Sequence, residues 1–133
     1  MLVGQRNMPK TRVEFYREAD GEAPVVEWLQ DLLAANERAW ANCRARIELL
    51  GQFGHELRRP AADYLRDGIY ELRAKQGHVQ YRLLYFFHGR EVVVLAHAHT
   101  KEDEVPKTDI ERAIKRKRSF EANPKAHTYE SKD

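Results

Sequence analysis

Two arginines, two histidines and a lysine stand in the second half of the chain at positions that strands would bring together. They are Arg73, Arg82, His97, His99 and Lys101. A guanidinium group binds phosphate through two parallel hydrogen bonds, and a histidine exchanges protons near neutral pH. Cleavage of an RNA backbone by its own 2′-hydroxyl needs cations on the phosphate, a base and an acid. The residues therefore predict a metal-independent ribonuclease site, with the arginines on phosphate, either histidine as the acid–base group and the lysine in support.

These side chains share one face only if three strands run antiparallel in sequence order. Residues 69–74, 79–87 and 91–98 alternate and are rich in Tyr, Val and Phe, which is typical of strands. Their connectors are short enough for hairpins. Directly opposed residues point to the same side of a sheet, so one face is expected to carry the cationic set together with Glu71 and Gln80.

The same alternation predicts which residues form the core. With a two-residue loop between the second and third strands, Val92 and Val94 point to the same side as Tyr81 and Leu83. This apolar face is expected to pack against Trp28, Leu32, Trp40 and Ile47 of the preceding helices, since amphipathic helices need a surface to bury. Apolar residues on the cationic side are expected to lie under the last helix.

Upstream and downstream residues predict the remaining elements. Residues 12–17 alternate as a short strand. Pro24 suits the first turn of a helix, and Asn36 suits the N-cap of a second helix. A last helix is expected over 109–120. The predicted fold class is α+β: a strand, a two-helix hairpin, a three-stranded antiparallel meander and a C-terminal helix.

Length, charge and cysteine content exclude several classes of protein. The chain has 133 residues, with 23 Lys and Arg against 21 Asp and Glu and a net charge of +2, which excludes a histone-like condenser of nucleic acid. The single cysteine, Cys43, permits no internal disulfide and suits a reducing compartment. No apolar run approaches the roughly 20 residues of a membrane span, so we expect a cytoplasmic protein. One domain is predicted over 11–121, between a flexible leader at 1–10 and a flexible tail at 122–133.

Simpler interpretations of the same residues remain open. A solvated antiparallel sheet also exposes Arg, Glu, Gln and His, and Glu71 can pair with Arg82 or Arg73 across strands. No metal and no cofactor is predicted, because His97 and His99 have no cysteine or paired carboxylates nearby to complete a metal site.

Four segments, in this order and with near-family spacing, resemble the RelE/HigB superfamily of bacterial toxins, and most closely its phage-derived HigB-like branch. Three are strand motifs: Glu-Leu-Arg ending at Arg73, Tyr-Arg-x-x-Tyr beginning at Tyr81, and His-Ala-His-Thr-Lys ending at Lys101. The fourth is Pro-x-x-x-Ile-x-x-Ala, from Pro106 to Ala113. The resemblance covers roughly residues 11–121, nearly the whole predicted domain.

The resemblance implies a RelE/ParE-like fold and the toxin component of a type II toxin–antitoxin module. Such a toxin cuts mRNA in the ribosomal A site and is neutralised by a cognate helix-turn-helix antitoxin, which links it to operator DNA. By motif match, Arg73 and Arg82 are carried over as phosphate-binding residues, and Lys101 as a basic position after the last strand. Glu71 departs from the pattern, because ribosome-dependent relatives tend to carry a basic residue there.

Two further alternatives stay open. The last predicted helix carries a basic run, either a contact for RNA or the antitoxin or a solvated helix end favoured by the helix dipole. Its members are Arg112, Lys115, Arg116, Lys117 and Arg118. The second alternative concerns the whole protein, since the same fold also serves non-catalytic binders: a gyrase-directed toxin, or a degenerate phage relative that binds antitoxin or DNA.

Overall fold

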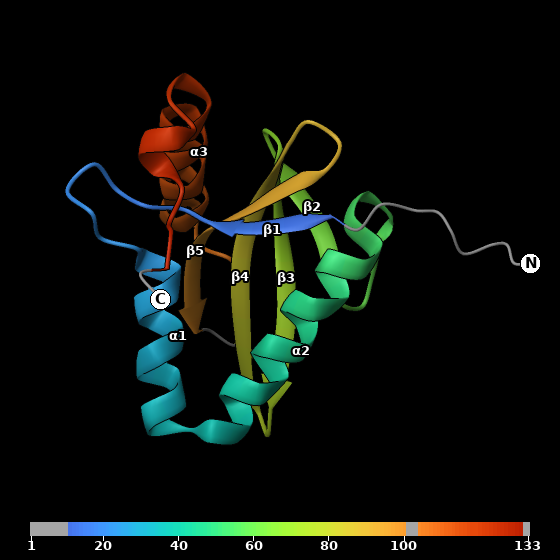
Figure 1. Cartoon of the computed structure of the whole chain (residues 1–133). Coiled ribbons are helices and arrows are strands. Elements are labelled where there is room, and N and C mark those ends of the chain that lie inside the picture. The colour runs from blue at the N-terminus through green and yellow to red at the C-terminus, as the bar shows by residue number, and fades with distance from the viewer. Residues whose placement is uncertain (1–10, 101–103, 132–133) are drawn as a thin grey trace, which may run out of the picture.

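One five-stranded sheet organises the chain, as Figure 1 shows for the computed structural model, which describes residues 11–100 and 104–131. The elements are β1 (Arg12–Phe15), α1 (Pro24–Ala35), α2 (Glu37–Phe53), η2 (Gly54–Glu56), β2 (Ala62–Arg66), β3 (Ile69–Gln76), β4 (Val79–His88), β5 (Val92–Thr100), α3 (Lys107–Ala122) and η3 (Lys125–His127). The strand order is β1-β5-β4-β3-β2, with β1 parallel to β5 and every other neighbouring pair antiparallel. The predicted fold class is confirmed.

Local sequence signals set the ends of the first two helices. Pro24 lies in the first turn of α1, where its missing N–H costs no hydrogen bond. Asn36 ends α1 and caps α2, because its side-chain oxygen accepts a hydrogen bond from the Ala39 N–H at 3.1 Å. Gly54 ends α2 with a φ of +51°, and a Cβ there would lie 2.1 Å from Thr11 Oγ1. Only glycine therefore fits at this turn.

The sheet buries side chains on both faces. On the face covered by α1 and α2 the buried residues are Val25, Ala39, Cys43, Leu50, Ala62, Leu72, Ala74, Tyr81, Leu83, Tyr85, Val93 and Leu95. Against α3 they are Tyr16, Ile69, Leu84, Phe86, Val94, Ala96, Ala113, Ile114 and Phe120. Trp28, Leu32 and Ile47 pack against the first cluster as predicted. Trp40 does not join it: its ring is half-buried, with the Arg44 guanidinium 5.5 Å from the ring centroid.

The prediction for Val92 and Val94 was wrong by one residue. Val94 is buried on the α3 side, while Val93 and Leu95 occupy the α1–α2 side. The cause is the hairpin loop: His88 opposes Val92, so the loop has three residues, 89–91, where two were predicted. Further along, Leu84 opposes His97 but Tyr85 opposes Leu95, so Ala96 is an extra residue on β5, a bulge. Each one-residue shift reverses the facing of the residues beyond it, so the bulge cancels the shift made by the loop.

Beyond the bulge the alternation returns to the predicted phase. Arg82 lies directly opposite His99, and Leu84 opposite His97. Directly opposed residues share a face. The predicted grouping of Arg82, His97 and His99 on one side of the sheet is therefore confirmed, although their predicted partners across the strand were not correct.

Strand β2 was not predicted. Its sequence, Ala-Asp-Tyr-Leu-Arg, is short and polar, and it lies in a segment that also holds Pro60 and the turn at Gly68. It forms because β3 offers a hydrogen-bonding edge, with Ala62 opposite Leu72 and Asp63 opposite Glu71. The extra strand places its side chains beside the predicted site.

Part of the segment predicted as a tail packs on β1. The rings of Tyr16 and His127 are stacked with centroids 5.3 Å apart, and the Tyr129 N–H donates to the Phe15 carbonyl at 2.8 Å. Residues 1–10, predicted as a leader, lie outside the described residues. Within the described chain, no helix is both long and apolar enough to cross a membrane.

The core arrangement predicts the effect of shortening Leu83, which is fully buried under α1 and α2. Leu83→Ala should lower the free energy of unfolding by about 2–5 kcal/mol, because it leaves a cavity that the packing cannot close. Leu33→Ala, at a side chain that is 41% exposed on α1, should change it by less than about 0.5 kcal/mol. Urea unfolding measures both, and equal effects would contradict this packing.

Candidate functional site

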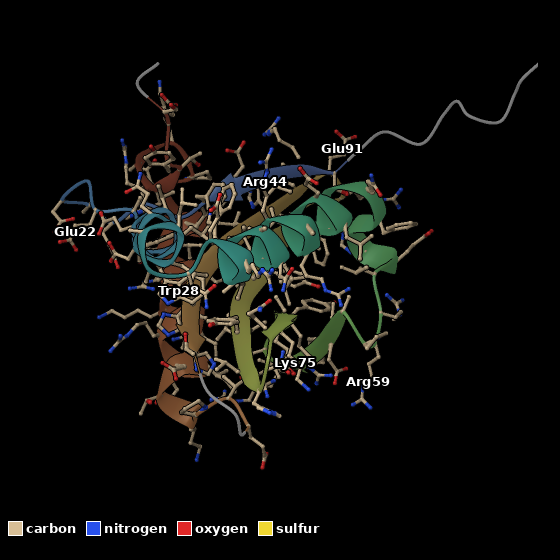
Figure 2. All side chains as sticks on the ribbon, turned by 90° about the horizontal axis from the view of Figure 1, so that it is seen from below. Glu22, Trp28, Arg44, Arg59, Lys75 and Glu91 are labelled. Atoms are coloured by element: carbon tan, nitrogen blue, oxygen red, sulfur yellow. The ribbon has the colours of Figure 1, made fainter. Side chains whose placement is uncertain are left out.

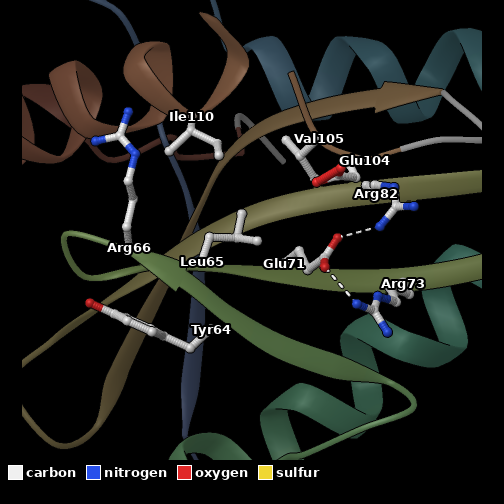
Figure 3. A pocket seen from close by; sticks show the side chains of 9 residues that line it. All are labelled: Tyr64, Leu65, Arg66, Glu71, Arg73, Arg82, Glu104, Val105 and Ile110. Atoms are coloured by element: carbon white, nitrogen blue, oxygen red, sulfur yellow. Dashed lines mark hydrogen bonds and ion pairs between the residues drawn. The ribbon is translucent and has the colours of Figure 1, made fainter. Parts of the chain in front are cut away.

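A cavity of about 720 Å³ opens on the α3 side of the sheet, between β2, β3 and β4 and the segment that leads into α3 (Figure 3). It is lined by Tyr64, Leu65, Arg66, Glu71, Arg73, Arg82, Glu104, Val105 and Ile110. Three arginines and two glutamates thus share one cavity. The structure brings Arg73 and Arg82 together here, and it adds Arg66, which comes from the unpredicted strand β2. We call this space the arginine cavity.

The carboxylate of Glu71 is the centre of the arginine cavity. Its side chain is 3% exposed; Arg73 donates to Oε2 from a terminal guanidinium nitrogen at 2.8 Å, and Arg82 donates to Oε1 (Figure 3). The β3–β4 register makes this possible, because Arg73 lies directly opposite Arg82. A guanidinium has five N–H donors, more than Glu71 takes up. The carboxylate therefore holds both arginines at the wall of the cavity while neutralising one of their two charges.

Asp63 extends this ion-pair arrangement to the edge of the sheet. Its Oδ2 lies 3.5 Å from a terminal nitrogen of Arg73 and accepts hydrogen bonds from Arg59 at 2.7 and 3.0 Å. The hydrogen bond from Arg59 is the main reason that the pKa of Asp63 is lowered from its usual value. Asp63 thus remains a carboxylate that holds an arginine on each side.

His97 is held inside the protein by two partners from α3. Its Nε2 lies 2.8 Å from Asp109 Oδ1, and its Nδ1 lies 3.2 Å from a terminal nitrogen of Arg116. Because a guanidinium only donates, Nδ1 must accept and Nε2 must carry the proton. Burial lowers the pKa of His97, although Asp109 opposes that shift. His97 is therefore a neutral ring that ties β5 to α3, with both nitrogens engaged.

His99 lies closer to the arginines than His97 in the sheet, since it stands opposite Arg82. Its side chain is 10% exposed, and its Nδ1 is 3.8 Å from Asp109 Oδ2. Neither histidine lines the arginine cavity. Lys101, the last member of the predicted catalytic set, lies outside the described residues.

The predicted basic contact on α3 divides into two groups. Arg116 faces inward, donating to the Ala96 carbonyl at 2.8 Å and to Glu18 at 3.0 Å, so its guanidinium is already engaged within the protein, and its contact with RNA or the antitoxin stays a prediction. Lys117 pairs with Glu121 at 2.8 Å. The remaining three, Arg112, Lys115 and Arg118, are exposed.

The part of the chain that the structure describes offers neither a metal-ligand cluster nor an accessible thiol. Across residues 11–100 and 104–131, no group of three or more His, Cys, Asp and Glu side chains could hold a metal ion. Cys43 is a buried free thiol, and burial raises its pKa to about 12. It is a core residue rather than a nucleophile.

Sequence reasoning missed three residues of this region. Tyr64 and Arg66 were hidden because β2 was not recognised as a strand. Asp109 is an acidic residue in the first turn of α3, and such residues are common there because they suit the helix dipole. Only the packing of α3 on β5 shows that this carboxylate holds a histidine.

The fold, a five-stranded sheet with a helical hairpin on one face and a C-terminal helix on the other, is compatible with the RelE-like class of toxins. Residues 28–118 match the model of a family described as phage-derived protein Gp49-like (DUF891). The chain belongs to this Gp49-like family, which is a RelE/HigB-like toxin family. No curated protein matches the chain.

The buried ion pairs predict that Glu71 stabilises the fold. Glu71→Gln preserves the shape of the side chain but leaves Arg73 and Arg82 side by side without their shared carboxylate. We expect the free energy of unfolding to fall by about 3 kcal/mol, the lower end of the range for breaking a buried ion pair. The effect is at the lower end because both guanidiniums border an open cavity. Glu48→Gln, whose carboxylate forms an exposed pair with Arg44 on α2, should cost less than about 1 kcal/mol. A Glu71→Gln protein as stable as wild type would contradict the arrangement.

The position of His97 predicts a pH dependence of stability. Because burial lowers its folded pKa below the ordinary 6.5, the unfolded chain binds the proton more readily. The stability that the neutral His97 ring contributes is therefore complete above pH 6.5. It is lost as the pH falls from 6.5 through the lowered pKa of His97 in the folded protein. Relative to His97→Gln, wild type should therefore lose unfolding free energy more steeply below pH 6.5, by at most about 1.4 kcal/mol per pH unit. His78→Gln, at an exposed position, should follow wild type; parallel curves for wild type and His97→Gln would refute the assignment.

Proposed function

We propose that the protein is the toxin component of a type II toxin–antitoxin module, and that it inhibits translation by cutting mRNA on the ribosome without a metal ion. The observation that carries this proposal is the pair of guanidinium groups held side by side by Glu71 in an open cavity. Two oriented guanidiniums match the oxygens of a phosphodiester. Membership of the Gp49-like family supports the same function.

In the proposed reaction, an RNA phosphate lies on Arg73 and Arg82. The adjacent 2′-oxygen forms a bond to phosphorus, and the bond from phosphorus to the 5′-oxygen of the next nucleotide breaks. One proton leaves the 2′-hydroxyl and one joins the leaving oxygen, so the products end in a 2′,3′-cyclic phosphate and a 5′-hydroxyl. The arginines stabilise the extra negative charge of the transition state, which is usually the largest catalytic contribution.

The acid–base role fits His99 better than His97. Both nitrogens of His97 are engaged by Asp109 and Arg116, whereas His99 is the histidine that lies opposite Arg82 in the sheet. Lys101 directly follows β5 in the sequence. We therefore assign His99 the proton transfer, with Lys101 and ribosomal groups sharing it.

The partners follow from the same proposal. A cognate helix-turn-helix antitoxin would bind the toxin and connect it to operator DNA. The exposed cations of α3, Arg112, Lys115 and Arg118, suit an acidic segment of that antitoxin or the backbone of RNA.

A second candidate is a non-catalytic binding protein on the same fold. Two observations favour it: Glu71 neutralises part of the arginine charge, and His97 is a neutral internal ring. Such a protein would use the arginine cavity to bind, but would not cut.

Cleavage of mRNA separates the two candidates. Arg82→Ala should slow single-turnover cleavage of an mRNA in the ribosomal A site by on the order of 10²–10³-fold, the loss expected for one transition-state donor. Arg82→Lys should recover little, since an ammonium group cannot form the two-pronged contact. Wild-type enzyme that has been stripped of metal with EDTA before the reaction should cleave at an unchanged rate.

The matched control is Arg44→Ala, which removes an exposed arginine from α2 and should cleave like wild type. Thermal unfolding of each variant shows whether a loss of activity reflects a loss of fold. If folded Arg82→Ala cleaves like wild type, or if wild type binds programmed ribosomes and cuts nothing, the binding protein becomes the better account.

A further inference from the structure

A second cavity, of about 550 Å³, lies at the β2 edge of the sheet, on the face opposite the arginine cavity, since its apolar lining residues belong to the cluster under α1 and α2. It is lined by His55, Leu57, Arg58, Arg59, Ala62, Asp63, Tyr64 and Tyr70. Tyr64 lines both cavities, so the two meet across the edge strand β2. We call this second space the aromatic cavity.

The walls of the aromatic cavity are rings supported from behind by other rings. Tyr64 and Tyr70 meet edge to face with centroids 5.0 Å apart, and Tyr70 is stacked on Tyr85 at 5.3 Å. His55 is stacked on Phe87 at 3.6 Å. Flat rings fixed in this way offer a rigid stacking surface.

Tyr64 is a large aromatic residue that the fold leaves exposed. Its side chain is 53% exposed, on an edge strand whose other residues are alanine, leucine and charged side chains. Its hydroxyl accepts a hydrogen bond from the Gly68 N–H at 3.1 Å, which holds the ring in place. Tyrosine is enriched at interfaces because it combines an apolar ring with a polar hydroxyl, so a ring held at the mouth of a cavity suits a binding surface.

Charged side chains connect the two cavities in an alternating series. From β4 outward the series is Arg82, Glu71, Arg73, Asp63 and Arg59, each within ion-pair distance of the next. It begins at the phosphate-binding pair of the arginine cavity and ends at Arg59, which projects from the edge of the molecule (Figure 2). An extended anion that lies on Arg73 and continues over β2 therefore meets a second cation.

We propose that the aromatic cavity binds an unpaired base of the RNA strand whose phosphate lies on Arg73 and Arg82, with Arg59 contacting a flanking phosphate. The inference rests on the proposed function, because it takes the strand in the arginine cavity to be RNA. Alternating phosphates and flat bases match alternating cations and rings, and base–aromatic stacking is how proteins commonly hold single strands. The ring of Tyr64 is the element shared between phosphate site and base site.

The experiment measures binding of fluorescent single-stranded RNA octamers, at low salt, to wild type and variants. One octamer carries all its bases, and the others each lack one base along the strand. Wild type should lose affinity when one particular position is abasic. Tyr64→Ala should bind the complete octamer roughly 5- to 150-fold more weakly and should no longer distinguish the abasic octamers.

Two variants test whether the ring itself is responsible. Tyr64→Phe keeps the stacking surface and should bind within a few-fold of wild type. Phe53→Ala removes a ring that is equally exposed, at 51%, but lines neither cavity, and it should leave RNA binding unchanged. Arg82→Ala should weaken binding of every octamer to a similar extent, since it removes a phosphate contact that ignores the base.

The outcomes distinguish this inference from the function it rests on. If Tyr64→Ala binds all octamers like wild type while Arg82→Ala binds them weakly, the base site is refuted and RNA binding stands. If Tyr64→Ala instead loses affinity only for an antitoxin protein, the cavity is a protein-binding surface and the inference is overturned. If wild type binds no octamer, both the base site and the proposed RNA function fail.

Discussion

The buried carboxylate of Glu71 is the interaction on which the site depends. Taking a carboxylate out of water costs several kcal/mol in a real protein unless cations accompany it, and here two arginines do. Arg73 shares its strand and Arg82 lies on the next strand, so the carboxylate ties β3 to β4 at the floor of the cavity. The same pairing fixes both guanidinium groups before any ligand arrives. Donors that are already in position need no reorganisation during a reaction. The guanidinium groups of Arg73 and Arg82 keep this advantage although Glu71 neutralises part of their charge.

A second constraint fixes the position of α3. Asp109 and Arg116 hold His97 from opposite sides, and Arg116 also reaches the Ala96 carbonyl. Ala96 is the bulged residue of β5, and bulges leave backbone groups without a ladder partner. The helix thus supplies the donor that the bulge requires. One consequence is functional: a histidine used to hold a helix is not available to move protons, so any acid–base work falls on its neighbour.

The elements and their faces followed from local patterns. Pro24, Asn36 and Gly54 mark helix ends through backbone geometry that each residue type imposes, and period-two alternation located β3, β4 and β5. The grouping of Arg73 and Arg82 followed from that alternation alone, and the possible pairing of Glu71 with both was visible as a simpler alternative.

Features that depend on tertiary contacts were not predictable in this way. Strand β2 exists because β3 has an edge to pair with, so its polar sequence gave no signal. The three-residue loop before β5 and the bulge at Ala96 depend on how two strands meet, and the one-residue shift made by the loop was enough to exchange Val93 for Val94 under α1 and α2. Arg116 is indistinguishable from Arg112 in the sequence, yet only one of them faces the sheet.

The central claim is that Arg73 and Arg82 form one phosphate-binding unit. The most direct measurement is NMR observation of the arginine Nε–H groups during titration with a dinucleotide methylated at the 2′-oxygen, which can bind but cannot be cut. The account predicts that the signals of Arg73 and Arg82 shift together and saturate with one binding constant, while that of Arg44 on α2 stays fixed. Shifts confined to Arg112 and Arg118 of α3, with Arg73 and Arg82 unchanged, would contradict it.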